Sequence, residues 1–250
     1  MAGYSKTEGL ILREVKYKEA DRILTVYTAE EGKITLKAPG ALRKNSKLGA
    51  ATQQLVYSEF TALNRTGFTN ITEAVIKEGF DGLRRDFSSY ALGCYFAECI
   101  DAMCPEENPD RSILQLVLNS LYALSNSMYD CSLIKAAFEL RLMVILGYSP
   151  DLDACMFCGK KEPESPCIGI ETGRISCREC RTVDVGRTDY LCRDSLAAMR
   201  YIASAPAKQL FSFKIEEDAL KRLSKACEDY LLAHSERNFG TLDYWKKVRI

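Results

Sequence analysis

The chain is poor in histidine, with a single one, His234, among 250 residues. Many acid–base and metal-dependent active sites use histidine, because its ordinary pKa lies close to neutral pH. His234 stands in the polar stretch His-Ser-Glu-Arg at the end of a predicted helix, where a cation complements the helix dipole. A phosphate-binding P-loop, a G-x-G-x-x-G turn and a nucleophile elbow are also missing. We therefore predict that the protein is not an enzyme.

Long apolar runs are missing as well. No stretch approaches the roughly eighteen consecutive apolar residues of a membrane-spanning helix, so no membrane association is predicted. The first six residues, Met-Ala-Gly-Tyr-Ser-Lys, contain no apolar core of a signal peptide. These features predict a protein of the reducing cytoplasm, where disulfides are rare.

An excess of charge of one sign is a third absence. The chain has 34 basic and 34 acidic residues, so its net charge gives no support to nucleic-acid binding. The distribution is uneven, because residues 1–80 hold 12 basic and 9 acidic residues. Between Lys33 and Lys47 there are five basic residues and no acidic one, which indicates a local positive patch on a neutral protein.

The first eighty residues show the alternation and turn signals of short strands. A glycine or polar cluster separates each stretch from the next, and a long polar loop follows Pro39 and Gly40. The predicted strands cover residues 7–15, 22–28, 33–38, 55–63 and 69–76. Five such strands over this length fit a partly open barrel of the OB type.

After Gly79 the apolar period changes from two residues to about 3.6, which is typical of helices. Three helices are expected before Gly147, and two more at 193–203 and 216–236. We predict an α+β protein whose N-terminal five-stranded OB-type barrel is followed by an α-helical bundle with an inserted four-cysteine zinc ribbon. The predicted domains are an OB-fold domain at 1–79, a helical domain at 80–150 and 191–250, and a zinc ribbon at 151–190.

Four of the eleven cysteines form the pattern C-x2-C, eighteen residues, C-x2-C. Two such turns on a hairpin each supply one edge of a tetrahedron, so four thiolates close around one Zn²⁺ and leave no position for water. A coincidental arrangement without metal, two disulfides and a redox pair are the alternatives. The predicted ligands of one structural Zn²⁺ are Cys155, Cys158, Cys177 and Cys180.

The basic loop that follows the third predicted strand suits phosphates, since inter-strand loops of OB barrels line the groove for nucleic acid. The candidate DNA-binding residues are Arg22, Lys33, Lys37, Arg43, Lys44, Lys47 and Arg65. Tyr27, Tyr57, Phe60 and Phe68 are candidates for stacking on bases, although at alternating strand positions such aromatics more often belong to the core. A solvated, flexible hairpin tip is the alternative for the loop.

Three segments resemble the bacterial RecO recombination mediators. They are Thr7-Glu-Gly-Leu-Ile-Leu-Arg13, Glu19-Ala-Asp-Arg-Ile-Leu24, and Phe138-Glu-Leu-Arg-Leu-Met-Val-Ile-Leu-Gly-Tyr-Ser-Pro150 running into Cys155-x2-Cys158-Gly159. Residues 32–47 resemble the basic hairpin of that family, and the four ribbon cysteines match its metal site. The resemblance covers essentially the whole chain.

The resemblance implies a DNA repair and recombination mediator that binds single- and double-stranded DNA and anneals complementary strands. It implies work with RecR, indirect contact with the recombinase, and help in loading that recombinase onto DNA coated with single-stranded-DNA-binding protein. The acidic, apolar C-terminal tail of that coating protein is expected to dock on the helical domain, where Lys135 or Arg141 would meet a carboxylate. The expected location is the cytoplasm, in association with the nucleoid. The alternative is a protein-interaction scaffold with a zinc ribbon, whose contact with DNA or RNA is incidental.

Overall fold

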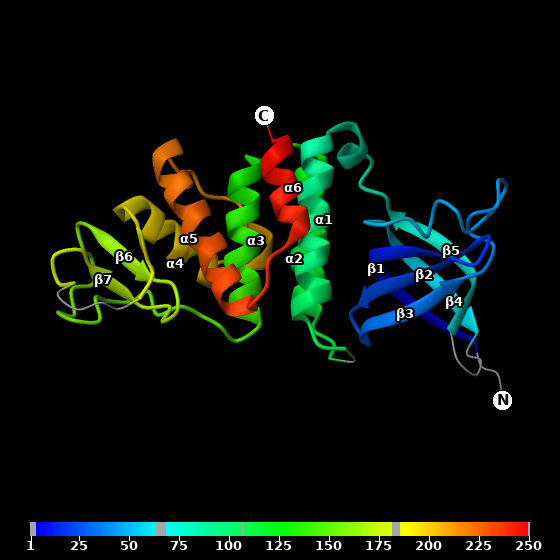
Figure 1. Cartoon of the computed structure of the whole chain (residues 1–250), viewed down its shortest axis with the longest axis horizontal. Coiled ribbons are helices and arrows are strands. Elements are labelled where there is room, and N and C mark those ends of the chain that lie inside the picture. Colours follow the sequence, from blue (N-terminus) through cyan, green and yellow to red (C-terminus); the bar gives the residue numbers. More distant parts are fainter. Residues whose placement is uncertain (1–3, 64–68, 107, 182–185, 250) are drawn as a thin grey trace. The chain divides into compact units, whose positions relative to one another are not determined.

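The computed structural model describes residues 4–63, 69–106, 108–181 and 186–249 (Figure 1). By their internal contacts the residues form two compact units. The first unit holds Met1–Asn126 and Phe239–Ile250, and the second holds Ser127–Asn238. This division into two units is not a test of the three domains predicted from the sequence, which stay a prediction.

Five strands of the first unit close into a barrel in the order β1-β2-β3-β5-β4, with β1 also paired to β4. This order is that of an OB-type barrel and confirms the predicted fold class. All neighbouring strands are antiparallel except β3 and β5, which meet in parallel over two residue pairs only. The strands are β1 (Tyr4–Tyr17), β2 (Asp21–Thr28), β3 (Gly32–Ala38), β4 (Tyr57–Leu63) and β5 (Thr69–Glu78).

The barrel core is built from the inward positions of this alternating pattern. Ile11, Leu24, Val26 and Phe60 are fully buried in it. The β3–β4 connection adds Ala41 and Leu48 to the same core, so this long segment packs against the barrel as a helix does in many OB folds.

Two helices of the first unit, Phe87–Met103 and Arg111–Ser125, begin at aspartate side-chain caps. The Asp86 carboxylate accepts the Ser89 N–H at 2.8 Å, and Asp110 accepts the Ser112 N–H at 2.7 Å. Tyr95 of α1 packs edge-on against Phe239, just before α6, with ring centroids 5.7 Å apart. Figure 1 shows α6 beside α1. The elements are η1 (Asp81–Arg85), α1 (Phe87–Met103), α2 (Arg111–Ser125) and α6 (Gly240–Val248), and α6 was not predicted.

The second unit consists of three helices and a small sheet. Its elements are α3 (Cys131–Ile145), α4 (Arg193–Ser204), η2 (Ala207–Gln209), α5 (Glu217–Ser235), and the strands β6 (Pro166–Gly169), β7 (Ile175–Cys177) and β8 (Thr188–Tyr190). The sheet order is β7-β6-β8. Within the described residues, no helix combines the length and the apolar character needed to cross a bilayer.

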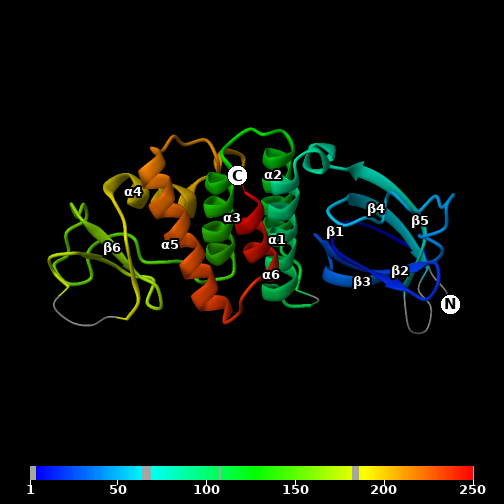
Figure 2. The same cartoon turned by 45° about the horizontal axis from the view of Figure 1, so that its top comes forward.

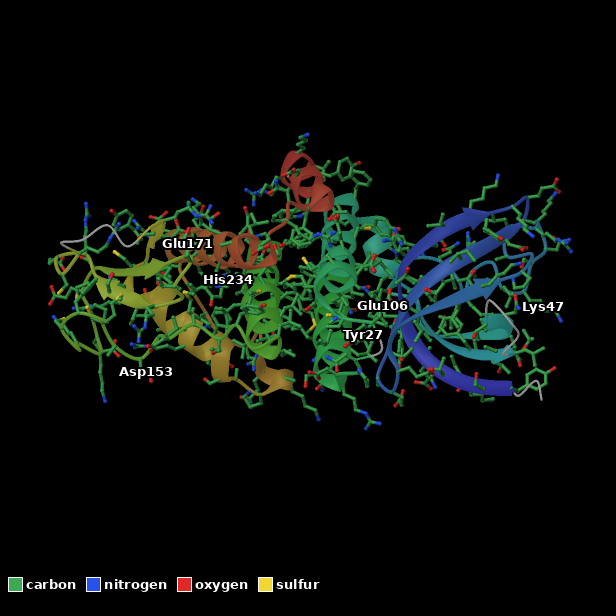
Figure 3. All side chains as sticks on the ribbon, turned by 60° about the horizontal axis from the view of Figure 1, so that its bottom comes forward. Tyr27, Lys47, Glu106, Asp153, Glu171 and His234 are labelled. Atoms are coloured by element: carbon green, nitrogen blue, oxygen red, sulfur yellow. The ribbon has the colours of Figure 1, made fainter. Side chains whose placement is uncertain are left out.

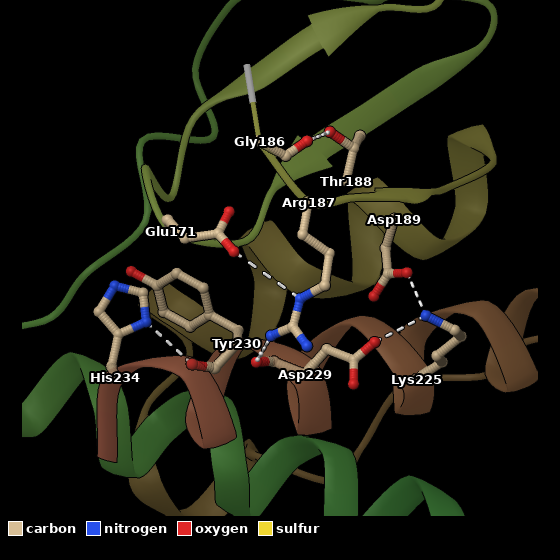
Figure 4. A network of polar contacts seen from close by, with 9 residues as sticks. All are labelled: Glu171, Gly186, Arg187, Thr188, Asp189, Lys225, Asp229, Tyr230 and His234. Carbon is tan, nitrogen blue, oxygen red and sulfur yellow. Dashed lines mark hydrogen bonds and ion pairs between the residues drawn. The ribbon is translucent and has the colours of Figure 1, made fainter. Parts of the chain in front are cut away.

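A polar network joins β8 to α5 within the second unit (Figure 4). Lys225 of α5 binds Asp189 of β8 and also Asp229, the latter at 2.7 Å. Arg187 pairs with Glu171 at 3.8 Å and donates to the Asp229 carbonyl at 3.3 Å. Burial raises the pKa of Asp189, and the Lys225 ammonium opposes this rise. The small sheet is therefore attached to the helices by charged contacts.

Candidate nucleic-acid interface and metal centre

The connection between β3 and β4, residues 39–56, forms a cationic loop. Consecutive turns fix its backbone: the Arg43 N–H donates to the Gly40 carbonyl, the Ser46 N–H to Arg43, and the Gly49 N–H to Ser46, at 3.0–3.3 Å. Gly40 has a positive φ of 66°, which favours glycine at this turn. Together with the buried Leu48, these bonds give an ordered loop, in contrast to the alternative of a flexible hairpin tip.

Two side chains at the start of β2, Asp21 and Arg22, form hydrogen bonds with the cationic loop. The Asp21 carboxylate accepts the Gly40 N–H at 2.7 Å and pairs with Lys37 at 3.0 Å. These two contacts, the backbone one first, lower the pKa of Asp21. Arg22 donates to the Gly49 carbonyl at 2.9 Å and to the Thr52 hydroxyl at 3.1 Å. The start of β2 thus positions both ends of the loop.

Three of the predicted DNA-binding residues are exposed on this loop. Arg43, Lys44 and Lys47 have no carboxylate partner in the part of the chain that the structure describes. Figure 3 labels Lys47 at the margin of the barrel. A fixed backbone that presents three unneutralised cations is suited to contact consecutive phosphates.

The other predicted cations of the barrel are engaged inside the protein. Arg22 pairs with Glu14 at 3.2 Å, and Lys33 pairs with Asp101 at 3.5 Å and donates to the Asp101 carbonyl at 2.6 Å. The exposed fractions of the Arg22, Lys33 and Lys37 side chains are 13%, 13% and 19%. Their geometry fits positioning of the loop and the barrel better than contact with a phosphate. Arg65 lies outside the described residues.

The aromatic residues predicted as candidates for stacking on bases also differ in their burial. Tyr27 and Phe60 are fully buried, so they belong to the core and cannot stack on bases. Tyr57 is half-buried and donates to Glu8 at 2.8 Å; burial first, then this bond, raises its pKa to about 12. Phe68 lies outside the described residues.

Sequence reasoning missed two cations beside the cationic loop. Lys16 and Lys18 are exposed at the β1–β2 turn, which is tied to the loop because the Leu42 N–H donates to the Ala20 carbonyl at 2.8 Å. The Lys18 ammonium lies 5.5 Å from the centre of the Tyr17 ring. The run Lys-Tyr-Lys at the end of a strand was the available signal, but only the backbone contact brings it to the loop.

Replacing Arg22 with alanine separates positioning from phosphate contact. The change removes the bonds to Gly49 and Thr52 and leaves Glu14, whose pKa burial raises, without its closest cation. We expect faster amide exchange in the cationic loop and a roughly threefold to tenfold loss of affinity for single strands, since ordering the loop then accompanies binding. The salt dependence of binding should not change; a smaller dependence would mean that Arg22 itself neutralises a phosphate.

Lys135 and Arg141, the candidates for meeting a partner's carboxylate, both lie on α3. Lys135 is 1% exposed and pairs with Glu139 at 2.9 Å and Glu228 at 2.8 Å. Burial lowers the pKa of Lys135, but the two carboxylates outweigh burial and raise it. Its role is therefore structural, and the prediction that it meets a partner is corrected. Arg141 is half-buried and donates to the Ala205 carbonyl at 2.5 Å; its contact with a partner stays a prediction.

The four cysteines of the predicted metal site come together beside the small sheet of the second unit, with Cys177 at the end of β7. Their sulfur atoms all lie within 4.8 Å of one another. Zn²⁺ bonds of about 2.3 Å in a tetrahedron imply sulfur separations near 3.8 Å, and the Cys158 and Cys177 sulfurs are 3.7 Å apart. The structure describes all eleven cysteines of the chain, and none of them forms a disulfide, so no disulfide joins these four. This group could hold a metal ion.

Backbone N–H groups of the four-cysteine group stabilise the ionised form of the Cys155 sulfur. The Cys177 N–H donates to the Cys155 sulfur at 3.2 Å. Burial opposes ionisation of Cys155, but N–H groups from Cys158, Cys177 and Phe157 lower its pKa to about 6. The pKa of Cys177 is raised by burial and by hydrogen bonding to its neighbours. Gly159, with φ 71°, closes the first turn by donating to the Cys155 carbonyl at 2.9 Å. Cys167 lies outside the group, as expected.

The described residues thus combine an OB-type barrel that carries an ordered cationic loop with a second unit that carries a four-thiol group. Two family models match the chain: Recombination protein O N terminal over residues 1–80 and Recombination protein O C terminal over residues 84–243. The chain belongs to the RecO family, a family of DNA repair proteins.

Several curated relatives cover almost the whole chain. The DNA repair protein RecO of Acetivibrio thermocellus is 32% identical over 245 residues, which are 98% of this chain and 97% of the relative. The protein of the same name from Rubrobacter xylanophilus is 30% identical over 231 residues, 92% of each chain. That from Alkaliphilus metalliredigens is 27% identical over 247 residues, 97% of this chain and 99% of the relative.

Proposed function

We propose that the protein is a non-enzymatic mediator of DNA repair and recombination that holds single- and double-stranded DNA by its phosphates. The observation that carries this proposal is that Arg43, Lys44 and Lys47, on a loop with a fixed backbone, have no carboxylate partner among the residues that the structure describes. Phosphate contacts of this kind release counterions and are independent of sequence. The buried Tyr27 and Phe60 are consistent with binding that does not read bases.

Annealing of complementary strands follows from the same physics. Two single strands repel each other, and a protein that neutralises phosphates on both lowers the repulsion at the moment of encounter. Because the cations are on one short loop and the net charge of the chain is zero, binding should be reversible and sensitive to salt. Reversible binding permits release of the duplex once it has formed.

Zn²⁺ is the proposed metal of the four-cysteine group, because four thiolates in a tetrahedron suit it. When bound, it would hold the turns at Cys155 and Cys177 together and stabilise a segment with few apolar residues. We propose residues 151–190 as a zinc ribbon inserted into a helical domain of residues 80–150 and 191–250, behind an OB-fold domain of residues 1–79. In this arrangement the metal has a structural role.

A strand-annealing experiment tests the proposed function. Two complementary single strands labelled with a fluorescence donor and acceptor should pair faster with the full chain than without it, and the gain should shrink as salt rises. The alternative, a scaffold whose contact with nucleic acid is incidental, predicts no gain at any salt concentration. An equal gain at low and high salt would contradict the phosphate mechanism.

We further propose that the acidic, apolar tail of single-stranded-DNA-binding protein docks on the second unit, and that RecR is a partner. A cavity of about 810 Å³ lies beside α3 and α4, with Leu133, Ala198 and Phe213 in its wall and the exposed Lys214 at its rim. Asp194 and Glu216 also line it. We therefore expect an apolar side chain of the tail to fill the cavity and its terminal carboxylate to meet Lys214.

The change Lys214→Glu should weaken binding of an acidic, apolar tail peptide about tenfold, because it replaces attraction with repulsion at one contact. Fluorescence anisotropy of the labelled peptide against the full chain measures this. Lys208→Glu is the matched control, since Lys208 is exposed on η2 and does not line the cavity. Equal effects of the two changes would mean that the peptide senses only net charge.

A further inference from the structure

The sheet formed by β1, β2 and β3 has an outer face that carries apolar side chains. Residues that pair across strands share a face, and Val15 pairs with Ile23, which in turn pairs with Lys37. Leu24 follows Ile23 in β2 and lies in the barrel core, so this row of three points outward. Val15 is 49% exposed and Ile23 is half-buried. In Figure 2, β2 and β3 lie side by side.

Tyr17 extends this outer face by one further position along β1. It pairs with Asp21, two residues beyond the pair of Val15 and Ile23, so it shares their face. The ammonium groups of Lys37 and Lys18 lie 5.3 Å and 5.5 Å from the centre of its ring. We call Val15, Tyr17 and Ile23 the apolar platform.

The apolar platform is continuous with the cationic loop. The Asp21 carboxylate accepts the Gly40 N–H at 2.7 Å, so the loop begins beside the residue that pairs with Tyr17. The Leu42 N–H donates to the Ala20 carbonyl at 2.8 Å, which ties the next part of the loop to the β1–β2 turn. A chain molecule that contacts the loop can therefore continue onto the platform.

The charges around the apolar platform favour a polyanion as its occupant. The Asp21 carboxylate is neutralised by Lys37 at 3.0 Å. Lys16 and Lys18 are exposed on either side of Tyr17, and neither forms a salt bridge within the parts of the chain that the structure describes. Glu19, also exposed, adds one negative charge at the turn. An apolar surface bordered by cations suits a polymer with flat rings and an anionic backbone.

We propose that the apolar platform binds the unpaired bases of single-stranded DNA, with one base stacked on the Tyr17 ring. The exposed Lys18 ammonium then leaves the ring for a phosphate, and the strand continues to the cationic loop. Stacking on an aromatic ring accepts any base, so no sequence is read. The inference rests on the proposed function and adds a preference for single strands, because the bases of a duplex are already paired and stacked.

Replacing Tyr17 with alanine tests the stacking contact in the full chain. Tyr17→Ala should lower the affinity for a single-stranded oligonucleotide about tenfold, since one base–aromatic stack is lost. Affinity for a duplex of the same length should change by less than about twofold. The salt dependence of single-strand binding should be unchanged, because no phosphate contact is removed. Fluorescence anisotropy measures all three quantities.

Two further variants serve as controls for Tyr17→Ala. Tyr17→Phe keeps the ring and should retain the natural affinity. Tyr122→Ala removes a tyrosine that is 53% exposed on α2, outside the barrel, and should bind both forms of DNA as the natural chain does. A loss in Tyr122→Ala equal to that in Tyr17→Ala would contradict a specific role of the platform.

The variant Tyr17→Trp reports the contact by its own emission. The single tryptophan of the natural chain, Trp245, is 1% exposed, so its emission should change little when DNA binds. A single-stranded oligonucleotide should quench the emission of Tyr17→Trp. An abasic strand of the same length, which has the phosphates without the bases, should bind through the cationic loop and leave the emission unquenched.

Three results would overturn the inference. The first is an equal loss of single-strand and duplex affinity in Tyr17→Ala, and the second is equal quenching of Tyr17→Trp by the abasic strand. The third is quenching by an acidic, apolar peptide but not by the oligonucleotide, which would assign the platform to a protein partner. If Tyr17→Ala keeps its single-strand affinity while reversal of the loop cations removes it, this inference fails and the proposed function stands.

Discussion

Reversing Arg43, Lys44 and Lys47 to glutamate together is expected to lower the affinity for single-stranded DNA by roughly a hundredfold or more at physiological salt. Each of these side chains is exposed and without a carboxylate partner among the described residues, so each is available to a phosphate. Loss of three phosphate contacts removes the counterion release that drives binding, and the new carboxylates add repulsion. Fluorescence anisotropy with a labelled oligonucleotide measures the change.

A matched triple variant controls for net charge. Lys208, Lys214 and Arg222 are exposed in the second unit and far from the loop in sequence, and their reversal changes the charge of the chain by the same amount. This control should lose only a few-fold in affinity. Equal losses in the two triple variants would show that the protein holds DNA by its overall field and not by the cationic loop.

Replacing Cys177 with serine is expected to abolish metal binding and to lower the thermal midpoint by about 10 °C. Cys177 is buried, donates its N–H to the Cys155 sulfur at 3.2 Å and lies 3.7 Å from the Cys158 sulfur. Serine supplies a poor ligand, and the loss of a structural metal removes several kcal/mol from the segment whose two turns it joins. Metal content by mass spectrometry and calorimetry of the same sample check both parts.

Cys192 provides the control for the metal experiment. Its sulfur accepts the Ser195 N–H at 3.5 Å as the cap of α4, and it is outside the four-cysteine group. Serine is a favoured cap, so Cys192→Ser should keep one metal per chain and equal or higher stability. If the natural chain held no metal, or if Cys177→Ser retained it, the proposal of a structural zinc site would be wrong.

The sequence predicted those features that depend on short-range patterns. Alternation between turn residues placed all five barrel strands, and the period near 3.6 placed the helices on either side of the four-cysteine segment. The C-x2-C spacing predicted which sulfurs meet, because each turn is local and only one hairpin has to bring the two turns together. The helix α6 was missed, since its nine residues are too few for a clear period.

The state of each cation could not be predicted, because its partner is distant in the chain. Lys33 is bound by Asp101, 68 residues away, and Arg22 by Thr52, 30 residues away. Lys135 is in a helix whose apolar pattern extends around most of its circumference, yet only the packing of α3 on α5 brings Glu228 to it. The sequence shows such residues only as charges. Tertiary contacts determine whether each cation is paired inside the protein or exposed to solvent.

The salt dependence of single-strand binding tests the role of the cationic loop most directly. For single strands the logarithm of the affinity falls with the logarithm of the salt concentration by about 0.7 for each phosphate neutralised. The slope for the variant with Arg43, Lys44 and Lys47 reversed should therefore be smaller by about 2 than that of the natural chain. Identical slopes for the two proteins would show that these three side chains contact no phosphate, and the account would be contradicted.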